Sequence, residues 1–140
     1  MNDMVNFHFD IDGENFTSAG EASVRIKKLL REMGFSSDTI RRVSVAMYEG
    51  EINMVIHADG GSADINVFGD RIEIILSDRG PGIPDVDLAM QEGYSTAPDN
   101  IRSLGFGAGM GLPNMKRYTD SMKIESEVGK GTTITMVVNV

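Results

Sequence analysis

The sequence predicts one domain built from both helices and strands, an α/β fold class in the broad sense, and three observations support it. The length of 140 residues suits one domain with a real hydrophobic core, and no internal repeat, low-complexity segment or domain boundary divides residues 1–140. Segments in which apolar and polar residues alternate, typical of strands, are interspersed with segments of helical periodicity. The hydrophobic fraction of 41% and the charged fraction of 24% are ordinary for a soluble globular chain.

Composition narrows the classes of function. The formal charge of −8 argues against a nucleic-acid partner, because phosphate binding depends on clustered lysine and arginine. No stretch approaches the ~20 apolar residues of a membrane span, and residues 1–4 lack the basic start of a signal peptide, so we expect a cytoplasmic protein with no membrane partner. The absence of cysteine excludes disulfides and thiolate metal sites. An acidic protein that binds a polyphosphate is expected to use a metal ion and backbone amides.

The N-terminal part predicts one strand and two helices. Residues 4–9 alternate apolar and polar side chains, as a half-buried strand does. A helix is expected from near Ser18 to Gly34, because Ser18 and Glu21 have the spacing of a capping box. A longer helix follows over residues 36–58, opened by an N-cap at Ser36-Ser37-Asp38. Its apolar positions at helical spacing are Ile40, Val43, Met47 and Met54.

The longer helix carries polar residues that a core helix does not need. Glu49, Asn53 and His57 lie at i, i+4 and i+8 and so line up along one side. Glu51 lies about 200° around the helix axis from Glu49, so the two acids are not expected to serve the same site. Gly50 costs roughly 1 kcal/mol relative to alanine, which indicates that close packing or a ligand needs the space. A solvated polar face is the alternative interpretation of Glu49 and Asn53.

The C-terminal part predicts two hairpins with helical segments between them. Gly60-Gly61-Ser62 is expected to break the long helix, and Gly69-Asp70 is a tight hairpin signal. The second hairpin closes through Val128-Gly129-Lys130-Gly131. The expected strands cover residues 64–68, 71–77, 121–127 and 132–138, and the helical segments cover 85–91 and 112–118.

A carboxylate and two glycines follow the strand over residues 71–77. Asp78 at the strand end can accept a hydrogen bond from an amine, and an ionised acceptor strengthens such a bond. Gly80 and Gly82 lack a Cβ, which lets the backbone approach a flat ligand. An ordinary acidic turn is the alternative, since aspartate, glycine and proline are also turn residues.

A glycine-rich stretch precedes the helix over residues 112–118. Gly93 to Gly111 is the least regular part of the chain, and its last seven residues carry four alternating glycines. A glycine-rich loop that runs into a helix N-terminus can cradle phosphates through free N–H groups, whereas a flexible linker is the alternative. The spacing of Gly105 to Gly111 does not match the Rossmann fingerprint, and Gly129-Lys130-Gly131 does not belong to a Walker A loop.

These separated pieces occur in a characteristic order, which resembles the histidine-kinase-like ATPase superfamily that includes gyrase, the MutL repair ATPases and the heat-shock chaperone ATPase. Length and element order look most like the anti-sigma-factor serine kinases, and bacterial regulatory switch kinases are also similar. The resemblance implies a two-layer α/β sandwich, with a mixed, mainly antiparallel sheet and helices on one face. The motifs are Glu49-x-x-x-Asn53, Asp78-x-Gly80-x-Gly82-Ile83, Gly107-x-Gly109-x-Gly111-Leu112 and Gly131-Thr132-Thr133-Ile134.

The resemblance implies ATP and Mg²⁺ as cofactors and assigns roles to residues of all four motifs. Asn53 would hold Mg²⁺ through its side-chain oxygen, and Glu49 would act as general base toward a serine hydroxyl or water. Asp78 would accept from the exocyclic amine of adenine, with Thr132 assisting. The remaining nucleotide-binding residues are Gly80, Gly82 and Ile83 at the adenine and Gly107, Gly109, Gly111 and Leu112 at the phosphates.

The resemblance also implies a function. We expect a serine/threonine kinase of the anti-sigma type that phosphorylates a small anti-anti-sigma-like protein, with sequestration of a sigma factor as a further role. The alternatives are a nucleotide-gated binding module without catalysis and a detached ATPase subunit that works with a separate phosphoacceptor. Members of the anti-sigma group suggest a homodimer. This chain departs from the group at Gly50, which is usually alanine, and at the additional acid Glu51.

Overall fold

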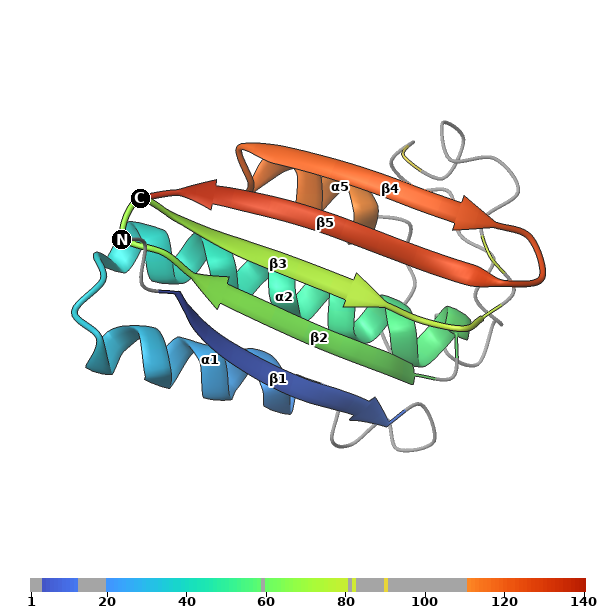
Figure 1. Ribbon diagram of the computed structural model, residues 1–140, viewed down its shortest axis with the longest axis horizontal. Coiled ribbons are helices and arrows are strands. Elements are labelled where there is room, and N and C mark those ends of the chain that lie inside the picture. The colour runs from blue at the N-terminus through green and yellow to red at the C-terminus, as the bar shows by residue number, and fades with distance from the viewer. Residues whose placement is uncertain (1–3, 13–19, 59, 81, 83–89, 91–110) are drawn as a thin grey trace.

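The computed structural model describes residues 4–12, 20–58, 60–80, 82, 90 and 111–140 (Figure 1). Over these residues the chain forms five strands and three helices. None of these helices has the length and hydrophobicity needed to span a bilayer. In chain order the elements are β1 (Val5–Asp12), α1 (Glu21–Glu32), α2 (Ser37–Ala58), β2 (Gly60–Val67), β3 (Arg71–Ser77), α5 (Gly111–Arg117), β4 (Ser121–Glu127) and β5 (Gly131–Asn139).

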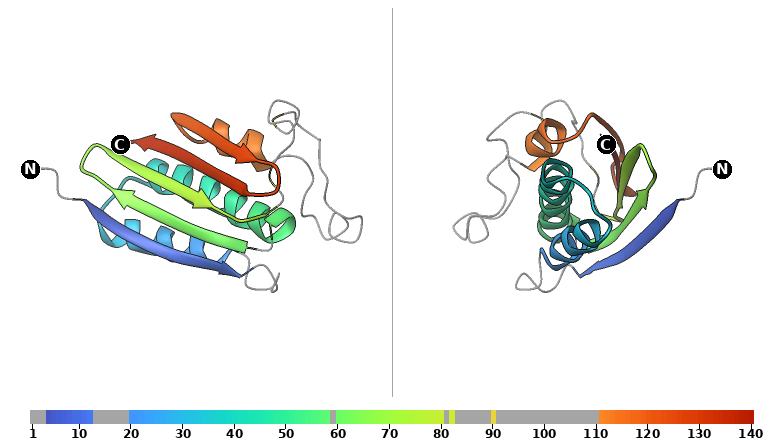
Figure 2. Two further views of the ribbon diagram at one scale, coloured as in Figure 1. Left: turned by 45° about the vertical axis from the view of Figure 1, so that its right-hand side comes forward. Right: turned by 90° about the vertical axis from the view of Figure 1, so that its left-hand side faces the viewer.

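The strands form one sheet in the order β1-β2-β3-β5-β4, and every neighbouring pair is antiparallel. The three helices lie together on one face of this sheet, as Figure 2 shows in its right-hand view. The two-layer sandwich with helices on one face is therefore confirmed. A mixed, mainly antiparallel sheet was expected, and every pairing among the described strands is antiparallel.

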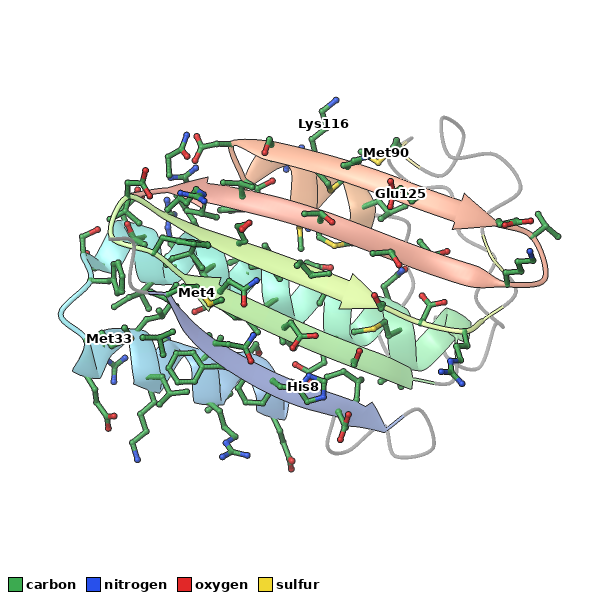
Figure 3. All side chains as sticks on the ribbon, viewed as in Figure 1. Met4, His8, Met33, Met90, Lys116 and Glu125 are labelled. Atoms are coloured by element: carbon green, nitrogen blue, oxygen red, sulfur yellow. The ribbon has the colours of Figure 1, made fainter. Side chains whose placement is uncertain are left out.

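Side-chain alternation along the strands explains why only one face of the sheet is covered. In β3, Ile72, Ile74 and Leu76 are buried toward the helices, whereas the residues between them are half-buried on the opposite face. Figure 3 shows His8 of β1 on this outer face, where its Nδ1 lies 2.8 Å from a carboxylate oxygen of Asp64 on β2. The outer face is thus the polar side of the sheet.

Helix α2 is the centre of the helical layer. It packs against α1 on one side and α5 on the other, and it also lies against β2 and β3. Its apolar residues enter one continuous core with the inward side chains of the sheet, as the helical spacing predicts. Over residues 37–55, the buried apolar residues are Ile40, Val43, Ala46, Met47, Ile52, Met54 and Val55, and all of them except Ile52 belong to this core.

The predicted strands and helices of the described residues are all present, and three differences in their boundaries exceed two residues or change the cap of a helix. The strands over 71–77 and 121–127 have the expected bounds, and β1 extends three residues beyond the predicted strand. The long helix ends at Ala58 as expected, but the next strand begins at Gly60 instead of Asp64, because Gly61 pairs with Ile11 and packs on the backbone of Ser77. The helix expected over 85–91 falls outside the described residues, apart from residue 90.

The third difference concerns the start of α1. The helix begins at Glu21 with Gly20 as its N-cap, so the capping box at Ser18 is not its start, and Ser18 itself lies outside the described residues. The cap comes from α2 instead. Glu51, only 3% exposed, accepts hydrogen bonds from the backbone amides of Gly20, Ala22 and Ser23 at 2.7, 3.2 and 3.1 Å. A buried carboxylate on one helix thus satisfies the free amides of another.

Candidate functional site

The ends of several helices and strands meet on one side of the molecule. Figure 1 shows that the C-terminal end of β3, the N-terminal ends of β5 and α5, and the last turns of α2 lie together. Two groups of the predicted site residues occupy this side. One group surrounds Asp78 and the β4–β5 turn, and the other lies between α2 and α5.

Asp78 is held by backbone on both sides. One oxygen of its carboxylate, Oδ1, accepts hydrogen bonds from the amides of Gly80 at 2.9 Å and Thr132 at 3.1 Å. The amide of Asp78 in turn donates to the carbonyl of Thr132 at 2.9 Å. Two amide donors thus fix the orientation of the carboxylate. The second oxygen, Oδ2, makes none of these bonds and is left to accept from another donor.

Glycine is required at two positions of the group around Asp78, Gly82 and Gly131. A Cβ on Gly131 would overlap the carbonyl oxygen of Asp78, and Gly131 has a φ of +123°. Gly82 has a φ of +81°, and a Cβ there would lie 2.5 Å from the carbonyl oxygen of Glu127 in the β4–β5 turn. Both positions therefore exclude other residues on steric and conformational grounds. The chain after β3 is packed directly on the β4–β5 turn.

The second group is formed by side chains of α2 beside the first residue of α5. A Cβ on Gly111 would lie 3.7 Å from Oε2 of Glu49 and 4.0 Å from Oδ1 of Asn53. The i, i+4 spacing on α2 thus brings the two side chains to the start of α5. Oε1 of Glu49 accepts a hydrogen bond from Nδ2 of Asn114, one turn further along α5, at 3.4 Å.

Burial perturbs the ionisation of Glu49. Removal from water raises the pKa of its carboxyl above the ordinary value, and the hydrogen bond from Asn114 opposes part of that rise. A carboxylate with a raised pKa binds a proton more strongly, which is the property that a general base at neutral pH needs.

Gly50 connects the two groups. A Cβ on Gly50 would overlap Cδ1 of Leu76 on β3 and lie 3.5 Å from Sδ of Met115 on α5. Leu76 comes two residues before Asp78, and Met115 follows Asn114. The interior glycine that the sequence singled out therefore serves close packing of α2 on β3 and α5.

The structure brings together most of the residues that the sequence predicted and leaves some of them outside its description. Leu112 and Thr132 are buried. Ile83, Gly107 and Gly109 lie outside the described residues. The sequence did not single out Asn114, for which the only available signal is an amide inside a helix, where asparagine is unfavourable.

A comparison with protein-family models gives the family. The model described as histidine kinase-, DNA gyrase B-, and HSP90-like ATPase matches residues 38–140. The chain belongs to this ATPase family. The matched region includes both groups of site residues, and the family description identifies ATP as the nucleotide, in agreement with the resemblance of the four motifs.

Named relatives cover most of the chain. The chain is 34% identical to the serine/threonine-protein kinase RsbT of Bacillus subtilis over 112 residues, which are 77% of this chain and 78% of that protein. It is 36% identical to the anti-sigma F factor of Clostridium acetobutylicum over 120 residues, 82% of this chain and 80% of that protein.

Solved structures support the fold. The crystal structure of the RsbU and RsbW domains of a Mycobacterium tuberculosis protein matches with a TM-score of 0.65 at 18% identity, over 96% of this chain and 32% of the other. The mycobacterial sensor histidine kinase MprB matches with a TM-score of 0.54 at 18% identity, over 96% of this chain and 97% of the other. The chain spans about a third of the first of these and nearly all of the second.

Proposed function

We propose that this protein is a serine/threonine kinase that transfers the γ-phosphate of Mg-ATP to a small regulatory protein of the anti-anti-sigma type. The observation that carries the proposal is the location of Glu49, a carboxylate with a raised pKa, beside Asn53 and the start of α5. The names of the relatives, a serine/threonine-protein kinase and an anti-sigma F factor, support the same activity.

The group around Asp78 would bind adenine. Oδ1 is occupied by the amides of Gly80 and Thr132, so Oδ2 is available to accept from the exocyclic amine. Guanine presents a carbonyl oxygen at that position, which a carboxylate repels. The backbone at Gly82 would line the flat face of the base, with Ile83 beside it in the chain.

The donor set at the other group fits a magnesium-bound triphosphate. Mg²⁺ prefers oxygen ligands and is usually bound through one or two side chains together with substrate phosphates. The amide oxygen of Asn53 would hold the ion, which supplies positive charge to the phosphates of this acidic chain. The start of α5 at Gly111 and Leu112, with Gly107 and Gly109 before it, would cradle the phosphates.

Glu49 would take the proton from the acceptor hydroxyl. In the transfer, a bond forms between the serine oxygen of the partner and the γ-phosphorus, and the bond from that phosphorus to the β–γ bridging oxygen breaks. ADP leaves with that oxygen, and the hydroxyl proton passes to the Glu49 carboxylate. Phosphoryl transfer depends chiefly on positioning and charge neutralisation, which these groups would provide.

The proposal is tested by phosphate transfer from γ-labelled ATP to purified anti-anti-sigma-like proteins encoded by the same genome. Wild type is expected to label one of them on serine or threonine, and Glu49→Ala is expected to remove the labelling. Glu125→Gln is the matched control, because Glu125 is an exposed acid of β4, paired with Lys123 at 3.0 Å. Transfer that persists in Glu49→Ala would contradict the base assignment.

Two other outcomes would favour the alternative functions. ATP-dependent binding of the partner without labelling in wild type would favour a nucleotide-gated binding module. An acid-labile phosphohistidine on the partner would favour a detached ATPase subunit with a separate phosphoacceptor.

A further inference from the structure

Asn114 joins two charged side chains near the start of α5. Its Nδ2 donates to Oε1 of Glu49 at 3.4 Å, and its Oδ1 accepts from Nη1 of Arg117 at 3.4 Å. Arg117 lies one turn further along the same helix. Three side chains from α2 and α5 thus form a chain of donors and acceptors that ends at Glu49.

The chemistry of the two neighbours determines how the amide is oriented. A guanidinium can only donate hydrogen bonds, and an ionised carboxylate can only accept them. The amide of Asn114 therefore directs its oxygen to Arg117 and its nitrogen to Glu49. The reverse orientation would place two acceptors together at Glu49 and two donors together at Arg117. Arg117 thus makes Asn114 a donor toward Glu49.

The hydrogen bond from Asn114 gives the two carboxylate oxygens of Glu49 different surroundings. Oε1 is engaged by Asn114, whereas Oε2 is the oxygen that lies nearest the Cβ position of Gly111. Without the amide, the carboxylate of Glu49 could rotate about its last bond or swing away from the start of α5. Burial of Glu49 favours the protonated form, and the donor on Asn114 favours the ionised one.

We propose that Asn114 is a positioning residue that holds the Glu49 carboxylate toward the start of α5, and that Arg117 orients the Asn114 amide for this task. The proposal rests on the proposed function, in which Glu49 is the base. Its consequence is that α5, the helix expected at the phosphates, also determines the geometry of the group that removes the proton. Nucleotide binding and base alignment would then depend on the same helix.

The first test follows the Glu49 carboxyl directly and needs no substrate. The ¹³C signal of its carboxyl carbon, assigned by its loss in Glu49→Gln, is titrated with pH in wild type, Asn114→Ala, Asn114→Asp and Arg117→Gln. The midpoint is expected to rise in Asn114→Ala, to rise further in Asn114→Asp because a second carboxylate replaces the donor, and to rise less in Arg117→Gln. Thermal unfolding identifies variants that have lost the fold, and Asn114→Ala alone suffices if the aspartate variant does not fold.

The second test measures phosphate transfer against pH. Asn114→Ala is expected to lower kcat roughly 2- to 10-fold, the equivalent of one hydrogen bond, to leave the KM for ATP unchanged and to move the acidic limb of the profile upward. Asn66→Ala on the outer face of β2, where Asn6 donates to Asn66 at 2.7 Å, is the matched asparagine control, and Arg41→Gln is the matched arginine control.

The results separate this inference from the proposed function. A titration identical in wild type and Asn114→Ala would overturn the positioning role, even if Glu49→Ala abolishes transfer. A shifted titration in a protein that transfers no phosphate would retain the contact and remove the kinase proposal. A kcat loss with an unmoved pH profile would show that Asn114 only supports the packing of α5, and would also overturn the inference.

Discussion

The two halves of the candidate site, around Asp78 and around Glu49, differ in the hydrogen bonds that hold them. Around Asp78 the donors are backbone amides, at 2.9 to 3.1 Å from their acceptors, and glycines pack on nearby carbonyl groups. Glu49 instead accepts a hydrogen bond from the side chain of Asn114 at 3.4 Å, and a Cβ on Gly111 would lie at ordinary van der Waals distance from its carboxylate. Among the described residues, the half assigned to adenine is thus held by the shorter hydrogen bonds, and the half assigned to the phosphates has a longer one that can shorten.

Under the proposed function, we expect the half around Asp78 to determine recognition of the base and the half around Glu49 to determine the rate. Two backbone amides fix the Asp78 carboxylate in one orientation, which suits the selection of a rigid base. Hydrogen bonds in catalytic sites are often long in the free enzyme and tighten with substrate. Substitutions should therefore separate into losses of affinity at Asp78 and losses of rate at Glu49.

The largest effect is expected from Glu49→Gln. Removal of the general base should lower kcat for phosphate transfer about 10²- to 10⁴-fold. The affinity for ADP, measured by calorimetry, should stay near wild type because the adenine half is intact. An equal loss of ADP affinity would break the separation between the two halves.

Glu51→Ala should be the next largest change, and it should act on stability. The substitution leaves the buried amides of Gly20, Ala22 and Ser23 without their acceptor, and an unsatisfied buried group costs about 1–3 kcal/mol, so the free energy of unfolding should fall by about 2–4 kcal/mol. Urea unfolding measures this change in the free energy of unfolding. Glu21→Ala, an exposed acid in the first turn of α1, is the control, and an unchanged midpoint in Glu51→Ala would disprove the interhelix cap.

Asp78→Asn should weaken adenine nucleotide binding by about 1.5–3 kcal/mol, the value of a charge-assisted hydrogen bond, or roughly 10- to 100-fold in Kd. The amide can still accept from Gly80 and Thr132, so the fold should persist. Calorimetry with ATP and GTP provides the measurement. Wild-type affinity for ATP would remove Asp78 from adenine recognition.

Asn53→Ala should reduce the dependence of ATP binding on Mg²⁺ without affecting adenosine binding. The comparison is the ratio of Kd values with Mg²⁺ and with a chelator, which should approach one in the variant. Asn66→Ala on the outer face serves as the control. A ratio as large as that of wild type would move the metal ligand to another residue.

The smallest effect should be a gain in stability from Glu49→Gln at neutral pH. The raised pKa of Glu49 means that the folded state binds a proton more tightly than the unfolded state, so stability is complete below the unfolded pKa and falls as pH rises through the folded pKa. The variant does not ionise there and should melt above wild type at pH 7. The difference should vanish near pH 4, and a variant that melts lower at pH 7 would contradict the burial of a charged Glu49.

Much of the fold was predictable because it rests on local periodicity. The bounds of β3 and β4 follow from alternation and turn residues, and α2 follows from its apolar spacing. The strand start at Gly60 was not predictable, since two glycines read as a break until their partner strands are known. The start of α1 failed for the same reason, because its cap is Glu51, which lies 28 to 31 residues away in the chain.

The sequence predicted the site residues that belong to local motifs. It did not predict the contacts that depend on how distant elements pack. Glu49 and Asn53 share a helix side by simple spacing, and Asp78 with its glycines follows a strand end. The contact of Asn114 with Glu49 depends on how α5 lies against α2, and no local pattern encodes that. The same holds for Gly131, whose need for glycine arises from the carbonyl of a residue in another segment.

The absence of a Cβ at Gly50 couples α2 to β3. Leu76 occupies the volume that an alanine at Gly50 would claim, and Leu76 is itself buried in the core. An alanine at position 50 would require the Leu76 side chain to move, because the overlap is with the end of that side chain. The side chains that positions 50 and 76 accept should therefore depend on each other.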